Sequence, residues 1–254
     1  MAGHSKWAQI KHKKGITDKA RGQLFTKLAN AITVAAREGG GNPETNFKLR
    51  LAIEKAKAAN MPKENIERAI KRGTGALEGI KLEEGIYEGF GPGGAAIIIK
   101  VLTDNKNRTI AELRNLFATH GGTLAESGAV SYLFTQRGLI KVELPEDTTQ
   151  AQEEEIELKI IEAGAEDIKE YENILEVYTN PTELEQIKKR LEELNLKIVG
   201  AELVLDPKTT LRITDEKQAT QILKLMDALE EHPNVTEVYS NFDIPDEIMN
   251  KTLK

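Results

Sequence analysis

Cationic side chains gather near the amino end of this 254-residue sequence in a pattern suited to binding phosphate groups. Asp18 is the only acidic residue among the first 27 positions. Lys and Arg side chains can follow a phosphodiester backbone and release its counterions whatever the base sequence. The candidate ligands here, including two histidines and a tryptophan between the cations, are His4, Lys6, Trp7, Lys11, His12, Lys13, Lys14, Lys19, Arg21 and Lys27.

Trp7 is the only tryptophan, and two interpretations of it stay open. Its ring lies among cations in the sequence, so it is suited to stack on an exposed base. Large aromatic side chains are also usually partly buried, so Trp7 equally suits an anchor that ties the first residues to a helical domain.

A second cationic group falls on a predicted helix that follows Pro62. Arg68, Lys71 and Arg72 lie within two turns of one another, and we include them among the candidate nucleic-acid ligands. Because Glu64 and Glu67 lie close by and oppose phosphate, a helix-turn-helix reader of DNA is only weakly indicated.

The net charge of −6 conceals a separation of signs along the chain. Residues 1–75 carry 16 Lys and Arg against 6 Asp and Glu, a net charge of +10. Residues 135–207 carry 8 against 19, a net charge of −11. Such asymmetry indicates that the first part contacts a polyanion, whereas the acidic part repels phosphate and favours basic proteins.

Other chemistry finds little support. The absence of cysteine excludes disulfides, Cys-ligated zinc and thiol catalysis. None of the four histidines has the spacing of a metal site, so we expect no metal, no cofactor and no enzymatic activity. Gly89–Gly94 matches G-x-G-x-x-G, but it precedes a predicted strand instead of opening a helix, as a dinucleotide site requires. Asp104–Arg108 has cations where a calcium loop needs oxygen ligands, and Asp104 or Asn105 better suits a helix cap.

The elements that must position the cations begin with three predicted helices. Leu24, Phe25, Leu28, Ile32 and Ala35 share one stripe of a helix that starts at Asp18 and ends at the glycines 39–41. Pro43 suits the first turn of a second helix that runs to about residue 59. Pro62 opens the third helix, and Gly73 supplies its C-cap.

The remaining sequence predicts an α+β architecture. Residues 136–207 read βαββαβ, which is the ferredoxin-like order. Residues 77–135 include a predicted strand at Val130–Phe134, and residues 208–254 read as strand–helix–strand. Joined, these two segments predict a second βαββαβ-type domain into which the acidic one is inserted. The alternative is two independent domains in series. Residues 1–76 form the basic helical domain. The longest apolar run is far too short to span a membrane, and no secretory signal is present, so we expect a cytoplasmic protein.

Several stretches together resemble one protein family. They are Ala2–Trp7 (AGHSKW), Gly22–Leu28 (GQLFTKL), Gly39–Pro43 (GGGNP), Asn60–Gly75, Tyr87–Gly94 (YEGFGPGG), Leu102–Arg108 (LTDNKNR) and Gly121–Phe134. On these residues the sequence closely resembles the YebC/PmpR family of bacterial proteins, which includes a mitochondrial translational activator of cytochrome oxidase. His4, Lys6 and Trp7 match the family's amino-terminal motif.

The resemblance implies a three-domain regulator without catalytic residues. The leading hypothesis is a DNA-binding transcriptional regulator that uses its basic amino-terminal segment and helical domain. The first alternative is a ribosome- or RNA-associated translation factor that relieves stalling, with the acidic domain touching ribosomal or other basic proteins. The second alternative is a protein-interaction scaffold.

Overall fold

The computed structural model describes residues 18–77, 82–171 and 173–252, and the side chains of 18–20 are also outside the description. The chain divides into two compact units. The first unit takes residues up to 52, 61–134 and 207–254, and the second takes 53–60 and 135–206. The three-domain division expected from the sequence stays a prediction.

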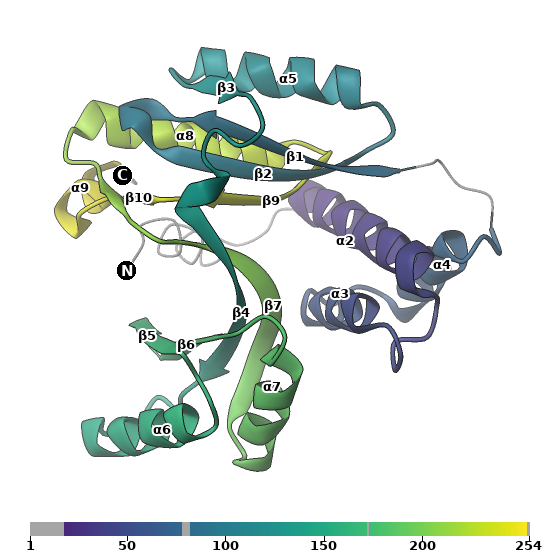
Figure 1. Ribbon diagram of the computed structural model, residues 1–254, viewed down its shortest axis with the longest axis vertical. Coiled ribbons are helices and arrows are strands. Elements are labelled where there is room, and N and C mark those ends of the chain that lie inside the picture. Colours follow the sequence, from purple (N-terminus) through teal and green to yellow (C-terminus); the bar gives the residue numbers. More distant parts are fainter. Residues whose placement is uncertain (1–17, 78–81, 172, 253–254) are drawn as a thin grey trace. The chain divides into compact units, whose positions relative to one another are not determined.

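Three helices begin the described chain, followed by the strands and helices of an α+β protein, as predicted (Figure 1). The helices up to residue 73 are α2 Asp18–Gly39, α3 Phe47–Ala58 and α4 Lys63–Gly73. They belong to the first unit except for residues 53–58 of α3, which belong to the second. The rest of the first unit comprises β1 Glu83–Phe90, η1 Pro92–Gly94, β2 Ala96–Thr103, α5 Lys106–Thr119, β3 Thr123–Ala125, η2 Ser131–Leu133, β8 Leu211–Arg212, α8 Glu216–Glu231, β9 Val235–Ser240, β10 Phe242–Asp243 and α9 Asp246–Thr252. The second unit holds β4 Phe134–Glu143, α6 Gln150–Glu162, β5 Asp167–Tyr171, β6 Ile174–Thr179, α7 Leu184–Glu193 and β7 Lys197–Pro207.

The start of α3 differs from the prediction. Pro43 lies in a turn before the helix, and α3 begins only at Phe47. The reason is Asn46, whose buried side chain accepts a hydrogen bond from the Leu49 amide at 3.1 Å and donates one to the Ala35 carbonyl at 2.7 Å. Asn46 therefore caps α3 and ties it to α2.

The first unit is built on an antiparallel sheet of order β3-β1-β2-β9. Ile97, Ile99 and Val101 of β2 pack with Leu113 and Phe117 of α5 in one core. The same core takes in the buried side of α8, so both helices cover one face of this sheet (Figure 1). Burying about twenty apolar side chains at roughly 1.5–3 kcal/mol each is the main force that holds this unit together.

The chain order of this sheet differs from βαββαβ. In the first unit, the elements that build and cover the main sheet follow the order ββαβ before the chain enters the second unit, and α8 and β9 come after the chain returns. Strand β8 does not join the main sheet and pairs in parallel with β10. The leading strand β1 was not predicted, because its glycines and glutamates have low strand propensity. It nevertheless pairs with β2 over its whole length, from Glu83 opposite Thr103 to Phe90 opposite Ala96.

The predicted strand at Val130–Phe134 is wrong. Residues 131–133 form the short 3₁₀ turn η2, and Phe134 begins β4. The amides of Val130 and Ser131 donate to the Glu88 carboxylate, so they are not available to a neighbouring strand.

The second unit has the ferredoxin-like arrangement expected from the sequence. Its strands follow the order β5-β6-β4-β7, with β4 and β5 each antiparallel to β6. Ile160 of α6 and Leu184, Ile187 and Leu191 of α7 are buried against the sheet. The chain leaves the first unit after Phe134 and returns to it at Pro207. The amide of Lys208 donates to the Leu133 carbonyl at 2.8 Å, so these two crossing points lie side by side.

Candidate nucleic-acid interface

Most of the amino-terminal candidates cannot be placed. His4, Lys6, Trp7, Lys11, His12, Lys13 and Lys14 lie outside the described residues, and so does the side chain of Lys19. Their assignment as nucleic-acid ligands stays a prediction.

Helix α4 carries the candidate cations that the structure does bring together. Pro62, with a φ of −57°, occupies the N-cap position of the helix, and Ile66 and Ala69 are buried. Arg68, Lys71 and Arg72 are all exposed. Their spacing of three and four positions places them on neighbouring turns of one face.

Close packing fixes α4 against α2. A Cβ at Gly73 would lie 2.3 Å from the Thr33 carbonyl oxygen and 2.7 Å from the Ala36 Cβ, so only glycine allows this approach. The Thr33 hydroxyl also donates to the Ala69 carbonyl at 3.1 Å. The three cations therefore project from a rigid support instead of a loop.

The charges on this face are not neutralised by the rest of the described chain. Within residues 18–77, 82–171 and 173–252, no carboxylate oxygen lies within 4.0 Å of the charged groups of Arg68, Lys71 and Arg72. Glu67, which would oppose phosphate, lies 3.7 Å from the Lys63 ammonium. Lys71 and Arg72 also occupy the last turn of α4, where positive charge favours the helix dipole, so part of their role is structural.

The candidates on α2 lie apart from this group. Arg21 is exposed, but it precedes Thr33 by twelve residues, which is about 18 Å along a helix. Lys27 is half-buried, and its ammonium donates a hydrogen bond to the Glu230 carbonyl near the end of α8. The structure thus joins α4's three cations into one group and does not bring Arg21 or Lys27 into it.

Arg37 is a cation that the sequence analysis left out. It is exposed on α2, directly after Ala36, which faces Gly73. One guanidinium nitrogen donates to the Leu82 carbonyl at 2.6 Å, and this bond orients the side chain. The sequence does place Arg37 in the last turn of a helix. That position alone indicates only a favourable interaction of the cation with the helix dipole and not a nucleic-acid ligand.

The glycine-rich segment that matches G-x-G-x-x-G serves the fold. A Cβ at Gly89 would lie 2.5 Å from the Phe117 ring, and one at Gly91 would lie 2.9 Å from the Ile97 side chain. Gly93 has a φ of +75°, a conformation that L side chains rarely adopt. The segment leads through η1 into strand β2, so it lacks the helix that would hold a pyrophosphate.

Glu88, directly before this segment, is a buried carboxylate that organises the loop before η2. One oxygen accepts the Gly128 amide at 2.8 Å, and the other accepts the amides of Val130 at 2.7 Å and Ser131 at 2.9 Å. Burial alone raises the pKa of the Glu88 carboxyl, but these amide donors together outweigh it and hold the pKa below its ordinary value. Glu88 therefore stays charged and holds the loop in place.

Residues 104–108 form a helix cap. The Asn105 side chain accepts a hydrogen bond from the Arg108 amide at 3.0 Å, and Asp104 lies 2.5 Å from the Arg108 guanidinium. Behind this cap, the hydroxyls of Thr103 and Thr109 are 2.9 Å apart, and both accept from the Asn234 amide group. The cap expected from the sequence is the one observed.

The two described histidines have structural contacts. His120 Nδ1 lies 2.8 Å from the Leu116 carbonyl at the end of α5. His232 Nδ1 accepts from the Asn234 amide at 3.2 Å, and its Nε2 lies 3.0 Å from the Glu112 carboxylate. In the part of the chain that the structure covers, no three His, Asp or Glu side chains are grouped so as to hold a metal ion.

These features define an α+β protein that begins with three helices, the last with an exposed cationic face, and continues with strands and helices that build two four-stranded sheets. The chain belongs to the TACO1/YebC family. Residues 5–76 match the model of the TACO1/YebC protein N-terminal domain, and residues 82–242 match that of the TACO1/YebC second and third domain.

Relatives cover nearly the whole chain. A protein of Halothermothrix orenii is 55% identical over 98% of both chains, and one of Persephonella marina is 55% identical over 99% of both. Each of these relatives bears the name "Probable transcriptional regulatory protein". The crystal structure of a conserved hypothetical protein from Aquifex aeolicus matches with a TM-score of 0.83 and 50% identity, covering 91% of this chain and 94% of that one. No helix in the described ranges is long and apolar enough to cross a membrane.

Proposed function

We propose that this protein is a non-enzymatic regulator that binds DNA through its basic amino-terminal residues and the exposed face of α4. The observation that carries this proposal is the group of Arg68, Lys71 and Arg72, held on a rigid helix with no carboxylate partner among the described residues. The net charge of +10 over residues 1–75 gives this part of the chain a positive electrostatic potential, which attracts phosphate groups. The names of the two relatives support a role in transcription.

The binding mode follows from the kind of groups present. Arg and Lys on one helix face contact phosphate oxygens, which positions a protein on a nucleic acid without reading its bases. Each phosphate neutralised releases counterions, so the binding constant falls as salt rises. We therefore expect a strongly salt-dependent affinity with little preference for sequence from α4 itself.

The test is fluorescence anisotropy of a labelled duplex DNA with the full chain, titrated at several salt concentrations. Changing Arg68, Lys71 and Arg72 together to Gln should reduce the slope of log K against log salt by about 2–3, because each lost phosphate contact removes about 0.9 from it. A matched control changes Lys48, Lys55 and Lys63 to Gln, which removes the same charge but from cations already paired with Glu38, Glu202 and Glu67.

The amino-terminal residues are tested separately. Changing Lys6, Lys11, Lys13 and Lys14 to Gln in the full chain should lower the affinity for DNA further. Equal salt slopes for the α4 variant and its control would refute the role of α4, and unchanged affinity in the amino-terminal variant would refute the role of those residues.

RNA is the alternative polyanion, because phosphate contacts alone do not distinguish it from DNA. Competition between duplex DNA and purified ribosomes for the full chain separates the two. If ribosomes displace the labelled DNA at a concentration of RNA phosphate far below that of the DNA phosphate, the translation-factor hypothesis replaces the transcriptional one. Binding to neither would leave the scaffold hypothesis.

A further inference from the structure

Helix α6 carries apolar side chains on its outer surface as well as on its inner one. Ile160 is fully buried against the sheet of the second unit. In contrast, Leu158 is 61% exposed and Ile161 is 55% exposed. These two side chains are three positions apart, so they lie beside each other on the helix surface. Folding of the second unit therefore leaves an apolar spot facing solvent.

Negative charge surrounds this spot. Residues 145–166 contain eight Asp and Glu against a single basic residue, Lys159. The Lys159 ammonium is held by Glu155 at 2.7 Å, so it does little to offset the remaining carboxylates. Glu154 and Glu162 are exposed and each lies one turn from Leu158. The α6 outer face, defined as Leu158, Ile161, Glu154 and Glu162, is thus apolar at its centre and anionic at its rim.

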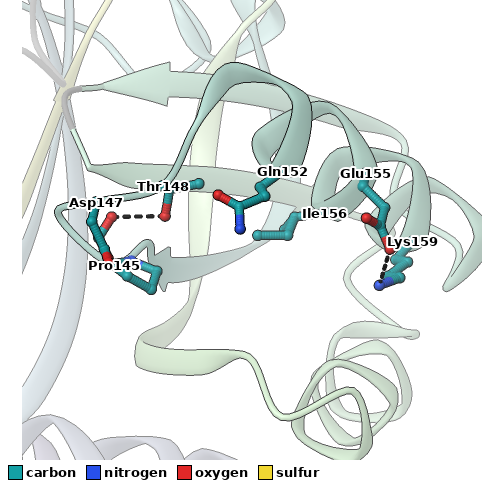
Figure 2. A pocket seen from close by; sticks show the side chains of 7 residues that line it. All are labelled: Pro145, Asp147, Thr148, Gln152, Glu155, Ile156 and Lys159. Atoms are coloured by element: carbon teal, nitrogen blue, oxygen red, sulfur yellow. Dashed lines mark hydrogen bonds and ion pairs between the residues drawn. The ribbon is translucent and has the colours of Figure 1, made fainter.

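A shallow hollow lies along another side of α6. Figure 2 shows side chains of α6 on one part of its wall and residues of the preceding turn on the other. Its volume is about 240 Å³, and it is lined by Pro145, Asp147, Thr148, Gln152, Glu155, Ile156 and Lys159. Sites for small molecules are usually about 300–1,000 Å³, so this hollow suits a single side chain better than a whole ligand. Ile156 offers that side chain an apolar contact, and Asp147 offers it a carboxylate.

We propose that the α6 outer face docks a Lys- and Arg-rich amphipathic helix of another protein. The apolar residues of such a helix, one turn apart, match the spacing of Leu158 and Ile161, as in other recognition of helices by apolar surfaces. Its cations meet the carboxylate rim, which steers the encounter and selects basic over acidic partners. The same carboxylates repel nucleic acid, so this surface is separate in its chemistry from the α4 face.

The probe is a synthetic helical peptide with leucines along one side and lysines along the other, titrated into the full chain and followed by anisotropy. A peptide of the same composition with scrambled order is the control for charge alone. We expect the amphipathic peptide to bind at least about tenfold more tightly than the scrambled one. Raising salt from about 0.05 to 0.5 M should weaken binding, because it shortens the range of the carboxylate field.

Substitutions locate the surface. Leu158→Ala combined with Ile161→Ala should weaken peptide binding about tenfold, and because both side chains are more than half exposed the fold should survive, as circular dichroism would verify. Leu194→Ala, at an exposed leucine that ends α7, is the matched control and should leave binding unchanged. Glu154→Gln with Glu162→Gln should reduce both affinity and its salt dependence.

Three outcomes overturn the proposal. One is equal binding of the amphipathic and scrambled peptides, which would mean diffuse charge attraction. Another is peptide binding that survives loss of Leu158 and Ile161. The third is a change in sedimentation coefficient of the Leu158→Ala, Ile161→Ala variant without any peptide, because the face would then join two copies of this chain.

Discussion

Replacing Glu88 by Gln tests how much the loop from Gly128 to Ser131 depends on one carboxylate. Glu88 is only 4% exposed and accepts three backbone amides. A Gln side chain keeps one acceptor oxygen but turns an NH₂ group toward at least one of these donors. Hydrogen bonds to a charged group contribute about 1.5–3 kcal/mol, and a buried donor without a partner costs about 1–3 kcal/mol. We expect Glu88→Gln to lower the free energy of unfolding of the first unit by about 2–4 kcal/mol at pH 7.

The pH dependence of this loss has a definite sign. The pKa of Glu88 is lower in the folded protein than its ordinary value of 4.5. A carboxyl of this kind contributes its full stabilisation above the unfolded pKa and loses it as the pH falls through the folded pKa. The difference between the native chain and Glu88→Gln should therefore be constant between about pH 7 and 5, and it should shrink below about pH 4.

Two measurements check this prediction. Denaturant unfolding gives the free energy, and amide hydrogen exchange at Gly128, Val130 and Ser131 reports the loop directly. Glu84→Gln is the matched control, since Glu84 lies exposed on the same strand. Unfolding within about 0.5 kcal/mol of the native chain, together with unchanged exchange at the three amides, would show that the carboxylate does not hold the loop.

Three further predictions, two of them with a control substitution, address other features. Gly73→Ala should lower the melting temperature markedly, because the new Cβ would meet the backbone of α2. Gly22→Ala, at an exposed helical site with open space, should instead raise the free energy of unfolding by about 0.5–1 kcal/mol. Equal changes in melting temperature for the two variants would contradict the close packing of Gly73. Burial and neighbouring carboxylates raise the pKa of Glu153, so its charged form destabilises the folded protein at neutral pH. Glu153→Gln removes this charge and should therefore raise the melting temperature at pH 7. At acid pH, where Glu153 is protonated in both the folded and unfolded protein, the substitution should have no such effect. Asn105→Ala should cost about 1 kcal/mol in urea unfolding by removing the cap of α5, while Asn107→Ala, inside the same helix, should cost much less.

Local signals predicted the helices, apart from the start of α3, and the order of strands and helices in the second unit. The end of α2 and both ends of α4 follow from glycines and a proline, whose effect on a helix is local and does not depend on the rest of the chain. The ferredoxin-like order of residues 136–207 follows from alternating strands and helices next to one another in sequence. The grouping of Arg68, Lys71 and Arg72 was also predictable, because helical spacing alone fixes it.

Contacts between distant residues were not predictable in this way. Glu88 organises amides about forty positions away, and Lys27 reaches a carbonyl 203 positions away. Strand β1 gained its place from pairing with β2 and from the close approach of Gly89 to Phe117, against its own propensity. Such partners leave no periodic trace in the sequence, since each depends on the completed tertiary structure.

The place of the second unit within the first affects how the protein folds during synthesis. Strand β2 is paired on one side by β9, which begins at Val235, more than 130 residues after β2 ends at Thr103. At a synthesis rate of about 5–20 residues per second, roughly 7–26 s pass between the synthesis of β2 and that of β9. During this time one edge of the apolar strand β2 has no partner strand. Residues 135–206 of the second unit are made within this interval, and residues 53–60 are made before it, so the second unit can fold while this edge of β2 is still unpaired.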